Sequence, residues 1–504
     1  MAIPKILGIE TEYGILVRGA AESNPIAASS TLINAYLTTL EHGRGGHRTQ
    51  RVGWDFQDES PGIDARGEAL LLSLAPEVET HLVNAVLTNG ARYYVDHAHP
   101  EFSCPETADA LSAVVYDRAG EEILVQSMDA ARAFLPDGEE IVVYKNNSDG
   151  KGNSYGCHEN YLVDRAVPFG QIVLHGTVHL VTRQVFTGAG KVGSETPGSD
   201  PDRVPFQITQ RADFFEEEVG LETTLKRPII NTRDEPHADA QKYRRLHVIA
   251  GDANMSETAT FLKLGTTALV LAMLEDDALG PPVGLARPVP AMHQVSRDLS
   301  LRTPLELDDH TTATALELQF GLLERAERYA EARGLAALGP PEVGSAVLEG
   351  WRSVLEGLEA DPDQVADRVD WAAKLRLFDA YRGRHGIGWE DPRLRAMDLQ
   401  YHDLRPGSSL GRRVGLRELV DATVVERAVS EPPDDTRAFF RGACLAKFSH
   451  DIVAANWDSI VFDTGEAALH RVPMLEPARG TRAHVGELLD RATTAQELID
   501  LLGR

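Results

Sequence analysis

The sequence predicts an α+β protein, and two observations carry this prediction. Segments with the alternation typical of strands and segments with the spacing typical of helices follow one another along 504 residues, without an obvious repeat or a Rossmann pattern. Hydrophobic residues make up 42% and charged residues 25%, which is ordinary for a folded, water-soluble chain. The length allows one large domain and a smaller one.

Composition also argues against several classes of protein. The longest apolar stretch, residues 264–274, is too short to cross a bilayer, and the start MAIPKILGIE lacks the features of a secretory signal. Three scattered cysteines, Cys104, Cys157 and Cys444, give neither a metal-finger spacing nor a fully paired disulfide framework. A net charge of −27 would repel a phosphate backbone. We therefore expect a cytoplasmic protein with no membrane and no nucleic-acid partner.

The first part of the chain predicts strands, a helix and a loop. The segment KILGIETEYGILV reads as a strand on which Glu10 and Glu12 share one face. A helix is expected near residues 30–40. Residues 43–68 are glycine-rich and charged and lack an apolar period, which predicts a mobile loop. A strand in GARYYVDHAHPEF and a helix around residues 108–133 follow.

The middle of the chain predicts further strands and then a helical region. The β-branched runs IVVY, QIVLHGTVHLV and QVF predict strands, the first two joined by a functional loop, KNNSDGKGNSYGCHENY. A helix capped by Asn254 or Ser256 is expected over Glu257–Glu275, and helices dominate to about Leu404. Prolines in EPPDDTRAFF predict a boundary, with a catalytic domain over residues 1–430 and a small C-terminal domain over residues 431–504.

The carboxylates of the first strand form the first candidate cluster. Glu10 and Glu12 would lie roughly 7 Å apart along the strand, a spacing that suits two adjacent divalent cations. Magnesium prefers oxygen ligands and is often shared between carboxylates and nucleotide phosphates. The alternative is a pair of glutamates on the solvated face of an edge strand.

The sequence DHAHPE forms the second cluster. It places four ionisable groups, beginning with Asp96 and ending with Glu101, at the end of an apolar strand. One carboxylate can bind a metal ion while its neighbour acts as nucleophile or general base. The alternatives are a polar turn made by His-Pro and a zinc site, although the spacing matches no recognised zinc motif.

The third cluster is SYGCHENY. Alternation puts His158 and Asn160 on one face, where the imidazole could bind a metal ion and the amide a phosphate. The alternative for His158 is a hydrogen-bonded core residue. Cys157 is read as a small buried thiol rather than a nucleophile.

Arginines gather in the fourth cluster, between residues 210 and 254. In so acidic a chain this local enrichment predicts a site for nucleotide phosphates and an acidic substrate terminus, because arginine binds both in a bidentate manner. Arg245 and His247 would share one strand face. The alternative is an ion-pair network with Asp234, Glu235 and Asp239.

Long segments containing these clusters resemble one known family. GIETEYG, NGARYYVDHAHPE, YKNNSDGKGNSYGCHENYL, INTRDEPHADAQKYRRLHVIAGDANMSET and LKLGTTALVL are similar, in order and over nearly the whole chain, to the family of Pup ligases and Pup deamidase/depupylases. This family lies in the glutamine-synthetase-like carboxylate-amine ligase superfamily. The resemblance implies a large antiparallel β-sheet packed with helices, plus a small C-terminal domain.

Within the family, three features favour the deamidase/depupylase branch: the insertion at residues 43–68, VDHAHPE and GLETTLKR. The end of the chain, from NWDSIVFDTG to VPMLEPARGTRAHVGELL, also resembles this branch. GNSYGCHENYLV and GDANMSET look ligase-like, so a Pup–protein ligase remains the alternative, and a non-catalytic Pup-binding protein is the alternative of another class.

The resemblance implies removal of the amide from the C-terminal glutamine of Pup and cleavage of the isopeptide bond between Pup and substrate lysines. The implied partners are Pup and pupylated proteins of the proteasome pathway, and the implied cofactors are ATP (or ADP with phosphate) and Mg²⁺. Asp96 matches the catalytic carboxylate, either as nucleophile, our hypothesis, or as water-activating base, and residues 43–68 match a loop over the active site. The matching magnesium ligands are Glu10, Glu12, Glu101, His158 and His247. The matching nucleotide-binding residues are Arg211, Arg233, Arg245, Asn160 and Trp457.

Overall fold

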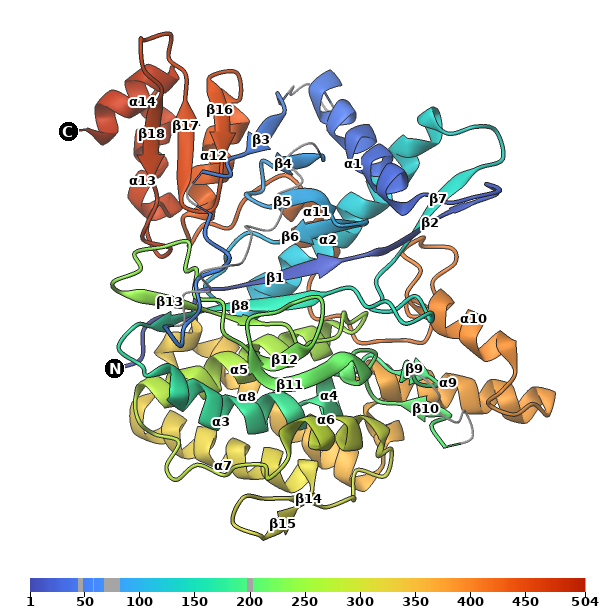
Figure 1. Cartoon of the computed structure of the whole chain (residues 1–504). Helices are drawn as coiled ribbons and strands as arrows, with labels where there is room; N and C mark the ends of the chain where they lie inside the picture. The colour runs from blue at the N-terminus through green and yellow to red at the C-terminus, as the bar shows by residue number, and fades with distance from the viewer. Residues whose placement is uncertain (44–48, 58, 68–81, 197–202, 504) are drawn as a thin grey trace.

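A ten-stranded sheet forms the centre of the computed structural model, which describes residues 1–43, 49–57, 59–67, 82–196 and 203–503 (Figure 1). The strands are paired antiparallel except for β3 and β16, which run parallel. In sheet order they are β13 (Tyr243–Val248), β8 (Cys157–Asp164), β1 (Leu7–Glu12), β6 (His99–Ser103), β5 (Arg92–Asp96), β4 (Asn84–Val86), β3 (Val52–Trp54), β16 (Ile452–Ala455), β17 (Ser459–Phe462) and β18 (His470–Pro473). The predicted α+β class with a large, mainly antiparallel sheet is confirmed.

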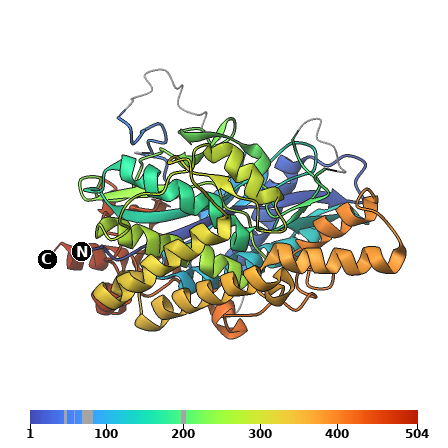
Figure 2. The same ribbon diagram turned by 90° about the horizontal axis from the view of Figure 1, so that it is seen from below.

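Helices cover one face of this sheet. Leu7 and Ile9 of β1, Tyr93 of β5 and Phe102 of β6 are buried on that face. They pack on α1 (Pro25–His42), α2 (Ala110–Ala131) and α5 (Glu257–Glu275), which α3 (Phe169–Thr182), α7 (Ala315–Arg333) and α8 (Pro341–Ala360) cover in turn. The two views agree that both chain ends lie at one end of the molecule, and that α9 (Asp370–His385) and α10 (Pro392–Tyr401) lie at the other (Figures 1 and 2). The opposite face of the sheet is left for polar side chains.

The remaining elements are short. The strands are β2 (Gly14–Arg18), β7 (Glu140–Tyr144), β9 (Lys191–Val192), β10 (Phe206–Gln207), β11 (Phe215–Gly220), β12 (Arg227–Asn231), β14 (Leu305–Glu306) and β15 (Thr312–Ala313). The helices are α4 (Gln184–Thr187), α6 (Pro288–Arg297), α11 (Ala422–Ala428), α12 (Ala438–Phe448), α13 (Arg482–Arg491) and α14 (Ala495–Leu502).

Helix α5 has the predicted bounds and the predicted cap. Ser256 Oγ accepts a hydrogen bond from the Ala259 amide (3.1 Å), which satisfies one of the unpaired donors at the helix start. Within the described part of the chain, α5 is the one helix long and apolar enough to cross a membrane, but 94% of that window is buried inside the protein. It is therefore a core helix of this fold.

Two predicted strands are helices. QIVLHGTVHLV forms most of α3, and QVF lies in α4, so the strand prediction was wrong for both. β-Branched residues favour strands only weakly, and burial against other helices overrides that preference. Ile172, Val178 and Val181 of α3 are buried in the main apolar core. The run IVVY is confirmed as part of β7, which pairs with β2.

The predicted loop at residues 43–68 contains a strand that was not predicted. Residues 44–48, 58 and 68 lie outside the described residues. Val52–Trp54 forms β3, and Trp54 is buried between β4 and the C-terminal strand β16. Mobility of the loop and its place over the active site stay predictions.

The C-terminal segment continues the main sheet. Strands β16, β17 and β18 extend it beyond β3, and α12, α13 and α14 pack beside them, in red at one end of Figure 1. Their apolar cluster also includes Val52, Trp54 and Val86 from the first part of the chain. A domain boundary near residue 430 stays a proposal.

Candidate functional site

Five adjacent strands, β13, β8, β1, β6 and β5, present polar side chains on the face opposite the helices. Directly opposite residues of antiparallel strands point to the same side, so strand register decides which side chains meet. The register pairs Glu10 with His158, and the next opposite pairs on this face are Glu12 with Glu101 and Asn160 with His247. The residues predicted separately from four clusters therefore lie side by side.

The first candidate metal-binding group is Glu10, His158 and His247, whose ligand atoms lie within 4.8 Å of one another. Asn160 connects its members: Nδ2 donates to Glu10 Oε1 (2.7 Å), and Oδ1 accepts from Arg245 Nη1 (2.7 Å). Because the carboxylate only accepts and the guanidinium only donates, the orientation of the amide is fixed. His247 Nδ1, 2.9 Å from the same Oδ1, must then carry the proton. Its Nε2 lone pair is left free to bind a cation.

Charge at this group also suits a cation. Burial raises the pKa of Glu10, but a hydrogen bond with His158 and neighbouring positive charge, Arg245 included, outweigh it, so the pKa lies below its ordinary value. Burial, reinforced by Arg245, holds the pKa of His247 well below its usual range. An ionised carboxylate and a neutral imidazole are the forms in which these residues bind metals.

The second candidate group is Glu12, Asp96 and Glu101, again with ligand atoms within 4.8 Å. Tyr94 Oη donates to Glu101 Oε1 (2.5 Å). Burial, and then the charges of Asp96 and Glu12, raise the pKa of Glu101 well above its ordinary value, and burial and Asp96 raise that of Glu12. Three carboxylates this close repel one another, so the group favours either a proton or a cation between them.

Asp96 is the carboxylate of this group that stays ionised most readily. Burial raises its pKa, but a hydrogen bond with His97 and the charges of His97, His158 and Arg92 lower it below the ordinary value. Asp96 Oδ2 lies 2.8 Å from His97 Nδ1, in the turn between β5 and β6. Neighbouring carboxyls with opposite pKa shifts are typical of sites that divide acid and base roles.

A glycine leaves room between the two groups. A Cβ atom on Gly156 would lie 2.3 Å from His158 Nε2 and 2.7 Å from Glu12 Oε1. Any other residue at this position would displace one ligand from each group, so Gly156 is a site residue that was not singled out from the sequence.

The predicted arginines occupy different positions. Arg245 lies beside the first group, with Nη1 4.0 Å from Glu10 Oε1. Arg211 is fully buried and donates to the Ile249 carbonyl and, at 3.3 Å, to Ser154 Oγ. Burial lowers its pKa, and the charge of nearby Glu12 opposes that shift. Arg211 therefore sits in the wall of the site with most of its donors in use.

Arg233 differs because its Nε is buried and has no hydrogen-bond partner among the described residues. The predicted alternative, an ion-pair network, exists around it: Asp234 pairs with Arg165 and Arg244. Arg233 is left out of that network. It remains available for an anion, close enough to His247 to affect its pKa.

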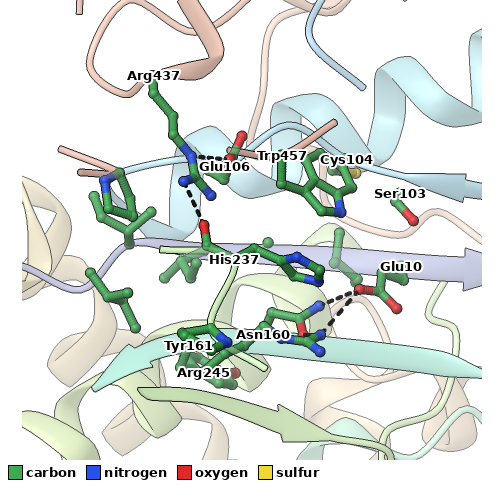
Figure 3. A pocket seen from close by; sticks show the side chains of 17 residues that line it. Glu10, Ser103, Cys104, Glu106, Asn160, Tyr161, His237, Arg245, Arg437 and Trp457 are labelled. Atoms are coloured by element: carbon green, nitrogen blue, oxygen red, sulfur yellow. Dashed lines mark hydrogen bonds and ion pairs between the residues drawn. The ribbon is translucent and has the colours of Figure 1, made fainter. Parts of the chain in front are cut away.

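A cavity that opens to solvent extends from the first group toward the C-terminal strands. Glu10, Asn160 and Arg245 line one side, and Trp457, His237 and Arg437 line the other (Figure 3). Arg437 Nη1 donates to the His237 carbonyl (2.6 Å) and so fixes that wall. The predicted residue Trp457 thus lines the same cavity as Glu10, one of the predicted metal ligands. His237 and Arg437 were not predicted as site residues.

Comparison with known proteins agrees with this arrangement. The family model described as Pup-ligase protein matches residues 5–461. The chain belongs to the Pup-ligase family. A depupylase of Acidothermus cellulolyticus is 52% identical and a Pup deamidase/depupylase of Mycolicibacterium smegmatis is 48% identical, and both alignments cover 99% of each chain.

Two solved structures of the Pup-ligase family are similar to this chain. The complex between Pup and its ligase PafA superposes with a TM-score of 0.80 and 30% identity, over 99% of this chain and 95% of that one. PafA in complex with ADP superposes with a TM-score of 0.72 and 34% identity, over 81% and 89%. Identity is therefore lower to these ligase structures than to the two depupylases.

One further residue of this Pup-ligase family member, Arg92, was missed because it reads as part of an apolar strand. Arg92 lies between aromatic rings, with its guanidinium carbon 4.1 Å from the centroid of Trp54 and 3.9 Å from that of Tyr94. Cys157, by contrast, is fully buried, and burial raises the pKa of its thiol, as expected for a structural cysteine.

Proposed function

We propose that this chain is an ATP-dependent Pup deamidase/depupylase. It converts the C-terminal glutamine of Pup to glutamate and cleaves the isopeptide bond between Pup and substrate lysines. The observation that carries the proposal is an ionised Asp96 within one of two candidate cation-binding groups, in a chain 52% and 48% identical over 99% of its length to two depupylases. Both reactions hydrolyse the same γ-carboxamide carbon, so one site serves both.

The nucleotide occupies the cavity between Arg245 and Trp457. The related ligase PafA binds ADP, which supports nucleotide use by this chain. Arg245 and Arg233 suit the phosphates, because guanidinium groups bind them in a bidentate manner and stay charged. Trp457 offers an aromatic surface to the base at the far side of the cavity.

Magnesium fits the donor set. Glu10, His158 and His247 would hold one ion, and Glu12 with Glu101 another, beside Asp96. The crowding that raises the pKa of Glu101 supports this assignment, since a cation relieves the repulsion among its neighbours. When bound, magnesium supplies positive charge to phosphate and carbonyl oxygens.

Asp96 performs the chemical step. We favour direct attack of its carboxylate on the γ-carbonyl carbon. The C–N bond breaks, and the nitrogen takes a proton from water and leaves as ammonia or as the lysine amine. Hydrolysis of the acyl-aspartate then releases glutamate-ended Pup and restores the Asp96 carboxylate. The hydrogen bond from His97 holds the carboxylate in place and ionised. A rapid quench that captures a Pup adduct on the peptide containing Asp96 supports direct attack. Ammonia and glutamate-ended Pup appearing together, with no adduct at any time, would assign Asp96 as the water-activating base.

The proposal is tested by incubating the protein with ATP, Mg²⁺ and Pup ending in glutamine, while following ammonia and the mass of Pup. Ammonia together with glutamate-ended Pup is the expected result. The alternative, a Pup–protein ligase, is favoured by the similarity to PafA. It predicts no ammonia, but conjugation of glutamate-ended Pup to a lysine-bearing protein with formation of ADP.

A further inference from the structure

Arg92 is held in one orientation on the site face of the sheet. Its guanidinium carbon lies over the rings of Trp54 and Tyr94, at 4.1 and 3.9 Å from their centroids. Trp54 is itself fixed, since its Nε1 donates to Glu59 Oε1 (2.6 Å) and its ring meets Trp457 edge-on at 5.2 Å. A guanidinium that contacts two aromatic rings keeps the N–H groups at its edge for hydrogen bonds to a further group.

The side chain of Arg92 runs along β5 toward Asp96. Its Nε donates to Asn84 Oδ1 (3.0 Å), and Asn84 lies opposite Tyr94, the residue midway between Arg92 and Asp96 on this face. Tyr94 in turn donates to Glu101 in the second carboxylate group. The guanidinium therefore lies over the middle of the roughly 14 Å that four residues span along a strand.

The edge of this guanidinium keeps its donors for a ligand. Its Nη1 and Nη2 atoms have no hydrogen-bond or ion-pair partner among the described residues, and Glu59 accepts from Trp54 instead. A paired edge of this kind matches the two oxygens of a carboxylate or a phosphate. This edge therefore suits an oxyanion bound beside β5, the strand that also carries Asp96.

We propose that Arg92 binds the terminal α-carboxylate of the glutamine or glutamate residue whose side-chain carbonyl reacts at Asp96. The inference rests on the proposed function and names its substrate-recognition residue. In a C-terminal glutamine, only Cα, Cβ and Cγ separate the α-carboxylate from the carboxamide carbon. Arg92 and Asp96 lie on the same face of one strand, and Arg92 is close enough to lower the pKa of Asp96, so the two can act on the two ends of one residue. The same α-carboxylate stays free when the side chain is joined to lysine, so one subsite serves deamidation and isopeptide cleavage. An internal glutamine lacks this group and is rejected.

The test compares two substrates and two variants in the presence of ATP and Mg²⁺. The substrates are Pup ending in glutamine and the same chain ending in glutamine α-amide, which cannot present a carboxylate. For the natural sequence we expect kcat/KM for ammonia release from the side chain to fall about a hundredfold with the α-amide. In Arg92→Met, kcat/KM should fall by about the same factor on the free acid and by little more on the α-amide. The substitution in the protein and the α-amide in the substrate remove the same interaction. Arg92→Lys should recover part of the loss.

Nucleotide affinity separates the two sources of an oxyanion. The proposal predicts an unchanged Kd for ATP in Arg92→Met, which also shows that the variant is folded. Weaker ATP binding with equal losses on both substrates would assign Arg92 to a phosphate and overturn the proposal, as would unchanged discrimination against the α-amide. Arg132→Met, at a side chain 64% exposed at the end of α2, is the matched control and should change nothing. If the natural sequence releases no ammonia from the free acid, the proposed function itself fails. This result differs from both outcomes that would overturn only the role of Arg92.

Discussion

Two buried clusters of carboxylates in this molecule contain the same residue types and behave oppositely. On α2, Asp117 and Glu121 both accept from Lys145 Nζ, at 2.6 and 2.8 Å, and Glu121 also pairs with Arg118 and Arg412. Burial raises the pKa of Glu121, but these cations outweigh it and lower the value to about 2. On the opposite face of the sheet, burial and neighbouring carboxylates raise the pKa of Glu101 well above its ordinary value.

The difference lies in what the protein supplies as compensation. The cluster on α2 receives its cations from the chain and is complete on folding. The cluster of Glu12, Asp96 and Glu101 is left with excess negative charge, which a bound cation would neutralise. Charge that the fold leaves uncompensated therefore coincides with the candidate functional site, whereas charge that the fold pairs marks a structural cluster.

The largest expected effect is on activity at the uncompensated cluster. Asp96→Asn should lower the rate of ammonia release at least about a thousandfold, because the reacting carboxylate is lost. Its thermal unfolding midpoint should not fall, because one of three repelling charges is removed, and ATP should still bind. Retention of activity within tenfold would contradict the assignment of Asp96.

Removal of a cation from the compensated cluster should lower the stability of the fold and leave the activity unchanged. Lys145→Met leaves two buried carboxylates without their shared cation and should lower the free energy of unfolding by about 3–5 kcal/mol in urea titrations. The rate per folded molecule should be unchanged. Lys151→Met, at an exposed lysine, is the control, and an equal effect in the two variants would contradict the comparison.

The pH dependence of stability should also follow the compensated cluster. The folded-state pKa of Glu121, about 2, is below the ordinary value of 4.5, so its stabilisation is complete above pH 4.5 and is lost as pH falls toward 2. The stability difference between the natural chain and Glu121→Gln should shrink by on the order of 2–3 kcal/mol over that window. Urea titrations at several pH values measure it. A difference that does not vary with pH would refute this account of Glu121.

The smallest expected effect comes from the amide that orients the first metal-binding group. Asn160→Ala removes hydrogen bonds to Glu10 and His247 and should weaken divalent-cation binding about 10–100-fold, as measured by calorimetry. Asn153→Ala, at an exposed asparagine, should bind cations like the natural chain. Equal affinities in the two variants would remove Asn160 from the site.

The sequence predicted several members of the candidate site because alternation along a strand is strict. Glu10 with Glu12, His158 with Asn160 and Arg245 with His247 share a face once their segments form strands, as they do here. That these pairs would be neighbours depends on strand register, which cannot be read from either segment. The register pairs Glu10 with His158, and it brings the Glu10 carboxylate to Asn160, 150 positions away.

Other features lacked a local signal. The run QIVLHGTVHLV has the composition of a strand, and only its burial among α5, α6 and α7 makes it part of helix α3. Strand β3 has three residues, too few to show alternation, and it forms by pairing with β4 and β16. Arg92 of β5 was missed for the same reason, because its significance comes from the contact of its guanidinium with the ring of Trp54 on β3.

Thermal unfolding of the natural chain and of Glu101→Gln, each in EDTA and in excess Mg²⁺, tests most directly whether uncompensated charge marks the site. In EDTA the variant should be at least as stable as the natural chain, since it loses one repelling carboxylate. Mg²⁺ should raise the midpoint of the natural chain by several degrees and that of the variant by less than half as much, because a ligand stabilises the state that binds it. The same rise in both proteins, or none in the natural chain, would contradict the account.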